Sequence, residues 1–464
     1  TTINDFLSGN YHQEFWENYT KPIAGGSKYD HWNNLQRRKG NRFIITSAQN
    51  NTYVHQEFLD SLKQCADYHE AEIIVSTFAY NKNGFQNLEK DNEDIWYDPK
   101  IKQYILNEPV LLADDLVLCA ELNILPTAAN PLSGMHSYVK GYSGIIPHAK
   151  VQMESLPTHK TKPARSLFTT GTITQRNYIE QKVGQKSSFH HVFGALLVEV
   201  DNDGDWFVRQ LIAETDTGEF YDLNVKFSPK GVSEGHSAEA IVYGDIHAEK
   251  MDIKSCRASF GINCGSMVDT LKPKYQFIHD VLDFTTRNHH NRNDTYFRWK
   301  TYEDLVDNDI DSVASILRQM NRDYSKMVVV ESNHNQAMEK WLREGDYHND
   351  SPRNALTFLK CQAKIVESIL DKKDVNIFEW YLKKLHPDLS ETRFLELDES
   401  FMVCGEDGIE CGSHGHVGAN GSRGGIAVYQ KLGTRYTIGH SHSPAIKDGV
   451  YVGGVLGKLD MTYN

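Results

Sequence analysis

Three features that would narrow the class of this protein are missing from its sequence. No apolar run reaches the ~20 residues that a membrane-spanning helix needs. The opening TTINDFLSGNYHQEF has no basic segment followed by an apolar one, so we expect no signal peptide. The seven cysteines form no CxxC pair. This cysteine usage argues against a disulfide framework or a zinc ribbon and indicates a reducing cytoplasm.

A surplus of positive charge is also missing. The formal net charge is −13, whereas a protein that holds DNA by charge alone is usually basic. A nucleic-acid role would therefore depend on bound metal ions or on local basic patches. The segments 37–42 and 159–165 are two such patches, and each either contacts a DNA backbone or forms a solvated face.

The first half of the chain, residues 1–235, predicts a separate domain of mixed α/β type. RFIITSAQ and EIIVSTFAY predict buried strands, and the segment between them has apolar residues at helical spacing. Such a β-α-β unit implies a parallel sheet, which we expect LLADDLVLCAELNI to continue. FGALLVEV and WFVRQLIAE predict a hairpin around DNDGD, because that pentapeptide lacks the glycine and glutamate positions of a calcium loop. This half shows no ligand constellation, and DNA binding and oligomerisation are its candidate roles.

The second half, residues 236–464, alternates apolar strands, polar strand tips and helices. AEAIVYGDIH, YQFIHDVLDF and KMVVVESNHN each predict a strand that runs into a polar tip. This pattern indicates an α/β architecture, in which chemistry is expected at the carboxyl ends of the strands. A helical insert at about 336–386 would cover the site as a cap or form an oligomer contact.

Residue types that bind metals recur at these strand ends. In an extended segment residues i and i+2 share a face, so the Asp and His of GDIH can point at one ion. Taken alone, each such residue is ordinarily a cap, a turn or a loop residue, but the series favours a mixed N/O site for Mn²⁺, Zn²⁺ or Fe²⁺. The candidates are Asp245 and His247 in GDIH, Asp280 in HDVLD, Asn333 and His334 in SNHN, His414 in HGH, and His440 and His442 in GHSH.

In order and spacing these motifs resemble those of the calcineurin-like metallophosphoesterase family, over about residues 240–464. The resemblance implies a β-sandwich flanked by helices that holds two divalent ions, Mn²⁺ first and Mg²⁺, Fe²⁺ or Zn²⁺ as alternatives. It implies that Asp280 bridges the ions and that His334 acts beside the phosphate as a general acid or transition-state stabiliser. By the same resemblance, one ion is held by Asp245, His247 and His442, and the other by Asn333, His414 and His440.

Three positions depart from the family pattern. His279 and Ser332 stand where the motifs have glycine. Asn335 stands where the family has the acid that orients the catalytic histidine. All seven expected metal ligands are present, so a metal-free relative is not the favoured interpretation.

The whole chain is similar to the early first-step-transfer DNase family of T-five-type coliphages. The segments that carry this resemblance are GTITQRNYIEQ, YGDIHAEK, VVVESNHNQ and HGHVGANGSRGG. It implies Mn²⁺-dependent hydrolysis of DNA phosphodiester bonds by two-metal activation of water, in the infected bacterial cytoplasm, where it would destroy host DNA early in infection. Weaker candidates for substrate binding are Arg423, Arg287, His289 and His290.

Two alternative functions use the same residues differently. A phosphatase or cyclic-nucleotide phosphodiesterase would act on small phosphoesters with the same ions. A non-enzymatic host-takeover protein would keep a vestigial metal site and bind a phage or host protein through residues 1–235. For partners we expect DNA, no membrane, and a second copy of the chain in a homo-oligomer.

Overall fold

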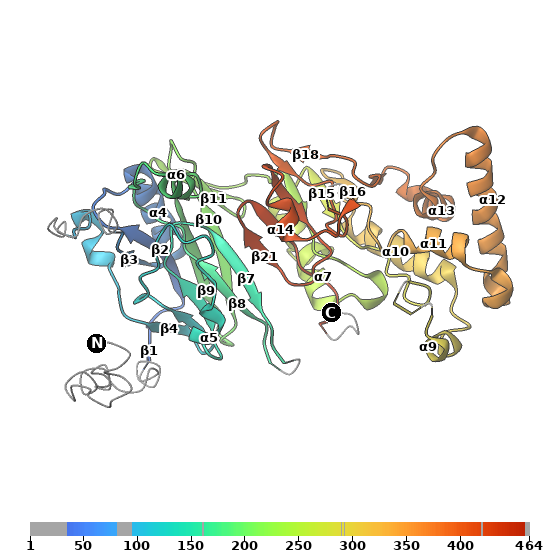
Figure 1. The fold of residues 1–464 in the computed structure, drawn as a ribbon, viewed down its shortest axis with the longest axis horizontal. Coiled ribbons are helices and arrows are strands. Elements are labelled where there is room, and N and C mark those ends of the chain that lie inside the picture. Colours follow the sequence, from blue (N-terminus) through green and yellow to red (C-terminus); the bar gives the residue numbers. More distant parts are fainter. Residues whose placement is uncertain are drawn as a thin grey trace, which may run out of the picture.

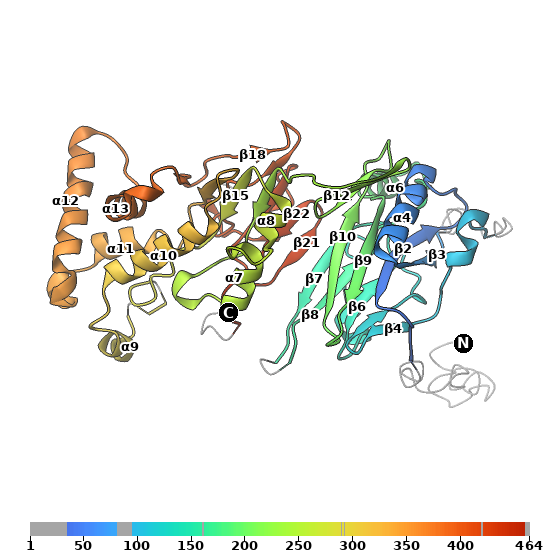
Figure 2. The same cartoon turned by 180° about the vertical axis from the view of Figure 1, so that it is seen from behind.

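The computed structural model describes residues 35–80, 95–159, 162–288, 290–291, 293–418 and 421–459. Figures 1 and 2 show an elongated molecule, with the sheets of the N-terminal half at one end and a group of helices at the other. Within the described ranges no helix is long and apolar enough to cross a membrane. All seven cysteines are free thiols, so no disulfide stabilises the chain, as the sequence predicted.

The predicted β-α-β unit forms the centre of a four-stranded sheet in the N-terminal half. Its two strands pair in parallel, but the predicted hairpin joins them antiparallel, so the sheet is mixed rather than parallel. Apolar residues of the connecting helix, among them Phe58 and Leu62, pack on one face of the sheet. In order the strands are β10 (Trp206–Ile212), β9 (Gly194–Val200), β2 (Arg42–Gln49) and β3 (Glu72–Phe78), and the helix is α4 (Gln56–His69).

The segment LLADDLVLCAELNI does not continue the sheet of the β-α-β unit, contrary to the expectation, but forms two strands of another sheet. Its residues form β4 (Val110–Ala113) and β5 (Leu116–Leu118), which pair antiparallel. Only Asp114 and Asp115 separate the two strands, and a parallel connection needs a crossover of a dozen or more residues.

An eleven-stranded sheet connects the two halves of the chain. The junction is the antiparallel pairing of β7 (Gln152–Leu156) with β21 (Ala445–Lys447), in which Glu154 lies opposite Ala445. The expected N-terminal domain is therefore hydrogen-bonded to the C-terminal half through a shared sheet. Besides β4, β5, β7 and β21, the strands of the eleven-stranded sheet are β1 (Gln36–Arg37), β6 (Ser143–Ile146), β8 (Arg165–Thr169), β22 (Val450–Val452), β20 (Arg435–Ile438), β19 (Ile409–Glu410) and β18 (Met402–Val403).

A second, entirely parallel sheet lies in the C-terminal half. One face packs against β18 and β19 through a cluster that includes Phe277, Val328 and Val403. The other face is covered by helices, which contribute Phe260, Leu317 and other apolar side chains to the largest core cluster. The strands are β14 (Ala240–Val242), β15 (Tyr275–Ile278), β16 (Lys326–Val329) and β17 (Arg393–Phe394), and the covering helices include α7 (Ile253–Phe260), α8 (Met267–Leu271) and α10 (Val306–Met320).

The stretch 336–386, expected to be helical, contains three helices. They are α11 (Ala337–Glu344), α12 (Ala355–Asp371) and α13 (Ile377–Leu385). In both views α12 is the outermost element at the helical end of the molecule, opposite the N-terminal sheets. Shorter helices are α5 (Met135–Tyr138), α6 (Lys182–Phe189), α9 (Thr295–Lys300) and α14 (Ile426–Tyr429), and β11 (Phe220–Asp222), β12 (Val225–Ser228) and β13 (Gly231–Ser233) form a small sheet.

Candidate metal centre

The strand ends of the C-terminal half bring the predicted motifs together. Because β14, β15 and β16 are parallel, their carboxyl ends lie at one edge of the sheet. Hydrogen bonds continue the pairing beyond β14 and β15: the N–H of Ile246 donates to the carbonyl of His279 at 3.1 Å, and that of His247 to Asp280 at 2.8 Å. The loops after β19 and β20 are joined in the same way, since the N–H of Gly439 donates to the carbonyl of His414 at 2.8 Å.

Four of the predicted ligands form the buried floor of the site, and each is at most 2% exposed. They are Asp245, His247, Asp280 and His414. Nε2 of His414 lies 3.3 Å from Oδ2 of Asp280. His442 closes the site above Asp245, with its Nε2 3.5 Å from Oδ2 of Asp245. These residues make two groups whose ligand atoms lie within 4.8 Å of one another: Asp245, His247 and His442, and Asp245, Asp280 and His414.

The other two predicted ligands lie at the rim of the site. The ring of His440 is 5.4 Å from the ring of His414, and its side chain is exposed. The backbone N–H of His440 donates to Oδ1 of Asp245 at 3.1 Å. Asn333 follows β16, and its side-chain oxygen is buried. Five of the seven predicted ligands, all aspartates and histidines, thus form groups whose ligand atoms lie within 4.8 Å of one another, and His440 is not a member of either group.

The donor set fits divalent metal ions. Oδ2 of Asp245, Oδ1 of Asp280 and Oδ1 of Asn333 are buried and accept no hydrogen bond from the described residues. Most buried polar atoms in proteins are hydrogen-bonded, so three such oxygens on predicted ligands need an explanation. Carboxylate and amide oxygens beside imidazole nitrogens are the mixed ligands that Mn²⁺, Fe²⁺ and Zn²⁺ accept.

The electrostatics of the floor favour a cation. Burial and the neighbouring charge of Asp280 raise the pKa of Asp245 to about 7. Burial works against ionisation of Asp280 as well, but the imidazoles of His414, His334 and His247 hold the pKa of that carboxyl well below its usual range. Burial opposes the charge of His414, yet the carboxylates of Asp280 and Asp245 raise its pKa. The two carboxylates lie so close together that their negative charges disfavour each other. A divalent ion bound between these side chains would neutralise that charge.

The backbone around the site is strained at three predicted ligands. His247, Asp280 and His440 have φ values of 49°, 43° and 64°, in the left-handed region that non-glycine residues rarely adopt. Such conformations cost on the order of 1–3 kcal/mol each and persist where the surrounding structure imposes them. Gly439 is required for a related reason: a Cβ at this position would lie 2.4 Å from Oδ1 of Asp245. The sequence patterns located these residues but gave no sign of the strain.

Asp283 is a functional candidate that the motif assignment left without a role. Its carboxylate Oδ1 lies 3.0 Å from Nδ1 of His247 and 3.4 Å from Nδ1 of His334, and its backbone carbonyl lies 3.0 Å from the same nitrogen of His334. Lys250 approaches the second carboxylate oxygen at 3.4 Å. Metal-binding and catalytic histidines ordinarily have such a partner, which fixes the ring and its tautomer. The motif HDVLD could have pointed to Asp283, because it contains a second aspartate three residues after Asp280.

Two further histidines belong to the site. Nδ1 of His279 lies 3.3 Å from Nδ1 of His414, and burial, with the nearby charge of His414, lowers the pKa of His279 to about 3. A neutral His279 can accept the Nδ1 proton of His414 and leave Nε2 of His414 directed at Asp280. The ring of His416 lies 5.3 Å from that of His414, and both its nitrogens are buried without a hydrogen-bond partner in the described part of the chain. His416 is therefore an additional candidate ligand.

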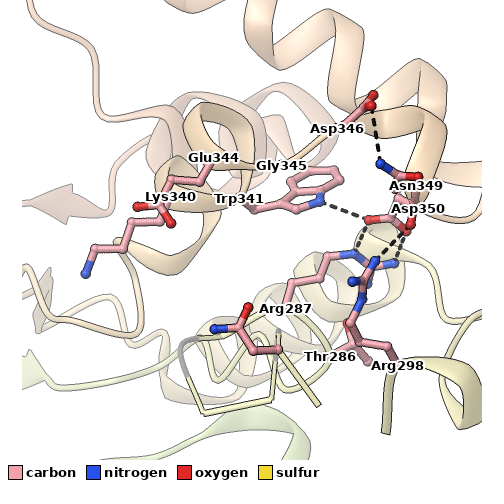
Figure 3. Close-up of a pocket in the computed structure, with 11 residues that line it drawn as sticks. Thr286, Arg287, Arg298, Lys340, Trp341, Glu344, Gly345, Asp346, Asn349 and Asp350 are labelled. Carbon is pink, nitrogen blue, oxygen red and sulfur yellow. Dashed lines mark hydrogen bonds and ion pairs between the residues drawn. The ribbon is translucent and has the colours of Figure 1, made fainter. Parts of the chain in front are cut away.

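The predicted substrate-binding residues have different surroundings. Arg287 lines a cleft of about 320 Å³, but Nε and Nη2 donate to the carboxylate of Asp350 at 2.7 and 2.6 Å, and Trp341 donates to the same carboxylate (Figure 3). This pairing ties the loop after β15 to the segment after α11, and it uses the guanidinium of Arg287 within the chain. The ring of His290 lies 5.9 Å from that of His334. Arg423 is exposed on the loop after His416, and His289 lies outside the described residues.

A phage protein is similar to this chain over nearly its whole length. Protein A1 of Escherichia phage T5 is 44% identical over 463 residues, which cover 97% of this chain and 82% of that protein. No protein-family model matches the chain, and no solved structure matches it significantly. Identity of this level over 97% of the chain leaves no doubt about common descent. The chain belongs to the family of Protein A1 of Escherichia phage T5.

Proposed function

We propose that the chain is a metal-dependent DNase that hydrolyses DNA phosphodiester bonds with two divalent ions, Mn²⁺ first among them. The observation that carries the proposal is the meeting of Asp245, His247, Asp280, His414 and His442 in two overlapping groups. Membership of a phage protein family supports the infected bacterial cell as its place of action. Host DNA, attacked early in infection, is the substrate that we propose.

The packing of the C-terminal half supports a calcineurin-like metallophosphoesterase fold for residues 236–464. A parallel sheet packs on one face against β18 and β19, which belong to a second sheet, and on the other face against helices. The candidate ligands follow β14, β15, β16, β19 and β20 in the order that the family motifs have.

The residues of the site divide the work of phosphodiester hydrolysis. Two divalent ions, when bound, neutralise the phosphate oxygens, supply hydroxide near neutral pH and stabilise the leaving oxygen. Oδ2 of Asp280 lies 3.3 Å from Nε2 of His414, in its own group, and 3.9 Å from Nε2 of His247, in the other group, a position that suits a shared ligand. His334, held through Nδ1 by Asp283, would present its other ring nitrogen to a phosphate or leaving-group oxygen.

The proposal is tested by incubating plasmid and linear DNA with the wild-type chain in Mn²⁺, Mg²⁺ or EDTA, beside Asp280→Ala. We expect cleavage with Mn²⁺, none with EDTA, and a loss of roughly 100-fold or more for Asp280→Ala, in line with removal of a residue that binds the metal directly. A matched control is Asp388→Ala, which removes an exposed carboxylate paired with Arg318 on the surface.

Each alternative has its own outcome in this experiment. Rapid turnover of a small phosphodiester without DNA cleavage would favour the phosphatase or cyclic-nucleotide phosphodiesterase. An undiminished effect on host cells by Asp245→Ala and His334→Ala variants would favour the non-enzymatic protein. Absence of metal-dependent cleavage under every condition would overturn the DNase proposal.

A further inference from the structure

Helix α12 carries an apolar stripe on the face that points away from the rest of the molecule. Leu356, Leu359, Val366 and Leu370 are between 46% and 77% exposed. Ala363 between them is also exposed. Large exposed apolar patches on a folded chain ordinarily mark an interaction surface.

The spacing of this stripe is that of a helix-pairing seam. Its members follow one another at intervals of three and four residues, the a and d positions of a heptad repeat. The opposite face of α12 is used within the chain, since Phe358 and Cys361 are buried in the main core cluster. The stripe is therefore a second packing face of a helix whose first face is already fixed.

The position of α12 leaves this face open to a second copy. In both views α12 stands at the extreme end of the elongated molecule, and no other element of the described chain lies beyond it. Two copies can therefore meet through their α12 helices with the rest of each molecule pointing away from the contact.

The charges beside the stripe indicate how the two helices would be oriented. One flank carries Lys360 and Lys364 in the first half of α12 and Glu367 and Asp371 in the second half. In an antiparallel pair related by a two-fold axis, the same flank of each helix faces its counterpart. Lys360 of one copy then lies close to Glu367 and Asp371 of the other at both ends. Lys364 lies near the two-fold axis and pairs with Glu367 of its own helix at 3.4 Å. A parallel pair would place this flank against the other edge of the stripe, which carries Gln362 and Ile369.

We infer that the chain self-associates through an antiparallel pair of α12 helices, with Leu359 of one copy packed near Leu370 of the second copy. The pairing closes on itself by two-fold symmetry, because each copy offers the same stripe and the same charges. The inference rests on the exposure, spacing and charge of α12 and holds independently of the proposed DNase function.

The test is sedimentation equilibrium of the full chain and two seam variants, Leu359→Glu and Leu370→Glu. The wild type is expected to be a dimer, and each variant to weaken self-association by roughly 100-fold, because a carboxylate replaces an apolar contact in the seam. A control is Ile253→Glu, which places the same charge on an exposed position of α7. Circular dichroism would show whether each variant keeps its helices.

A charge-reversal experiment tests the antiparallel orientation. Lys360→Glu alone and Glu367→Lys alone each set like charges against one another in an antiparallel homodimer and are expected to weaken it. An equimolar mixture of the two variants restores opposite charges on both sides, and we expect a heterodimer of nearly wild-type affinity. A monomeric wild-type chain, or a dimer that neither leucine variant weakens, would overturn the inference. Failure of the mixture to recover would overturn the antiparallel arrangement.

Discussion

The backbone carbonyl of Asp283 lies 3.0 Å from Nδ1 of His334, and the carboxylate of the same residue lies 3.4 Å from that nitrogen. A carbonyl oxygen can only accept, so Nδ1 of His334 carries the proton. The ring is thus held by a residue that follows β15. Asn335, which stands where related motifs have an acid, instead donates from its side-chain amide to the backbone carbonyl of Val330. Asp283 supplies the orientation that Asn335 cannot.

His334→Gln is expected to lower kcat for DNA cleavage by roughly 10²–10⁴-fold, the usual contribution of a general acid or base. The ion content should stay at the wild-type value, because His334 is not one of the expected metal ligands. Steady-state kinetics together with metal analysis of the same samples measures both. A large loss of bound metal in His334→Gln would instead make His334 a ligand.

Substitutions of Asp283 and Asn335 test which of the two residues orients the ring of His334. Asp283→Asn is expected to lower activity by roughly 10–100-fold, because it weakens the support of both His247 and His334. Asn335→Asp introduces the acid of the related motifs and should change kcat by less than about threefold, since Asp283 already holds His334. A strong gain of activity in Asn335→Asp would show that Asp283 does not orient the ring.

Gly439→Ala is expected to disrupt the site by steric conflict. The added methyl group would lie 2.4 Å from Oδ1 of Asp245 and 3.0 Å from Cβ of His279, so the carboxylate has to move. We expect at least tenfold weaker metal binding, of the order seen when ligand support is lost, measured by calorimetric titration with Mn²⁺. Gly141→Ala is the matched control, because a Cβ there meets no atom within 4 Å. Equal affinities in the two variants would contradict this geometry.

Arg287→Ala is expected to act on stability more than on substrate binding. It would leave the carboxylate of Asp350 without its two-pronged partner in a nearly buried position, and breaking a buried ion pair costs about 3–5 kcal/mol. Urea denaturation should show this loss, and the double variant Arg287→Met, Asp350→Leu should recover part of it. A raised KM for DNA with unchanged unfolding free energy would restore Arg287 as a substrate-binding residue.

The carboxyl of Asp309 on α10 predicts a specific dependence of stability on pH. Burial, with the nearby charge of Glu249, raises the pKa of Asp309 to about 9 from a usual value of 3.8. Between these two values the folded state retains a proton that the unfolded state releases, so the free energy of unfolding falls as pH rises through this window. Asp309→Asn removes the effect and should stabilise the chain at pH 8 by up to about 5 kcal/mol, since each pH unit above 3.8 contributes about 1.4 kcal/mol.

Measurement of the unfolding free energy at several pH values checks this prediction. The difference between Asp309→Asn and the wild type should grow steadily from about pH 4 upward, because deprotonation becomes increasingly favourable in the unfolded state. Equal pH profiles for the two proteins would show that the carboxyl of Asp309 is not held protonated in the folded chain.

The sequence was informative where function follows from local patterns. Apolar runs that end in polar tips predicted β14, β15 and β16, and parallel strands bring their carboxyl ends to one edge. The sequence pattern therefore predicts that Asp245, His247 and Asp280 lie together. The backbone conformation at these positions was not predictable in this way, because His247 and Asp280 adopt left-handed φ values rather than the extended backbone that the sequence suggested.

The sequence was uninformative where contacts depend on distant segments. Nothing near Glu154 indicates that it lies opposite Ala445, because strand register across such a distance is set by tertiary packing. The ion pair of Arg287 could not be predicted for the same reason, because its partner Asp350 is 63 residues away in a different segment of the chain. The sequence shows His279 only as a departure from a glycine motif. Its contact with His414, which can fix the tautomer of that ring, depends on the fold.

The number of divalent ions bound per chain tests the central claim most directly. After equilibration with Mn²⁺ and removal of free metal, elemental analysis of the wild type should give two ions per chain. Asp280→Ala should lose both. The single replacements His440→Ala and His442→Ala should each lose one, because the proposed assignment gives the two histidines to different ions. A wild-type chain that binds no ion, or a content unchanged in Asp280→Ala, would contradict the two-metal site.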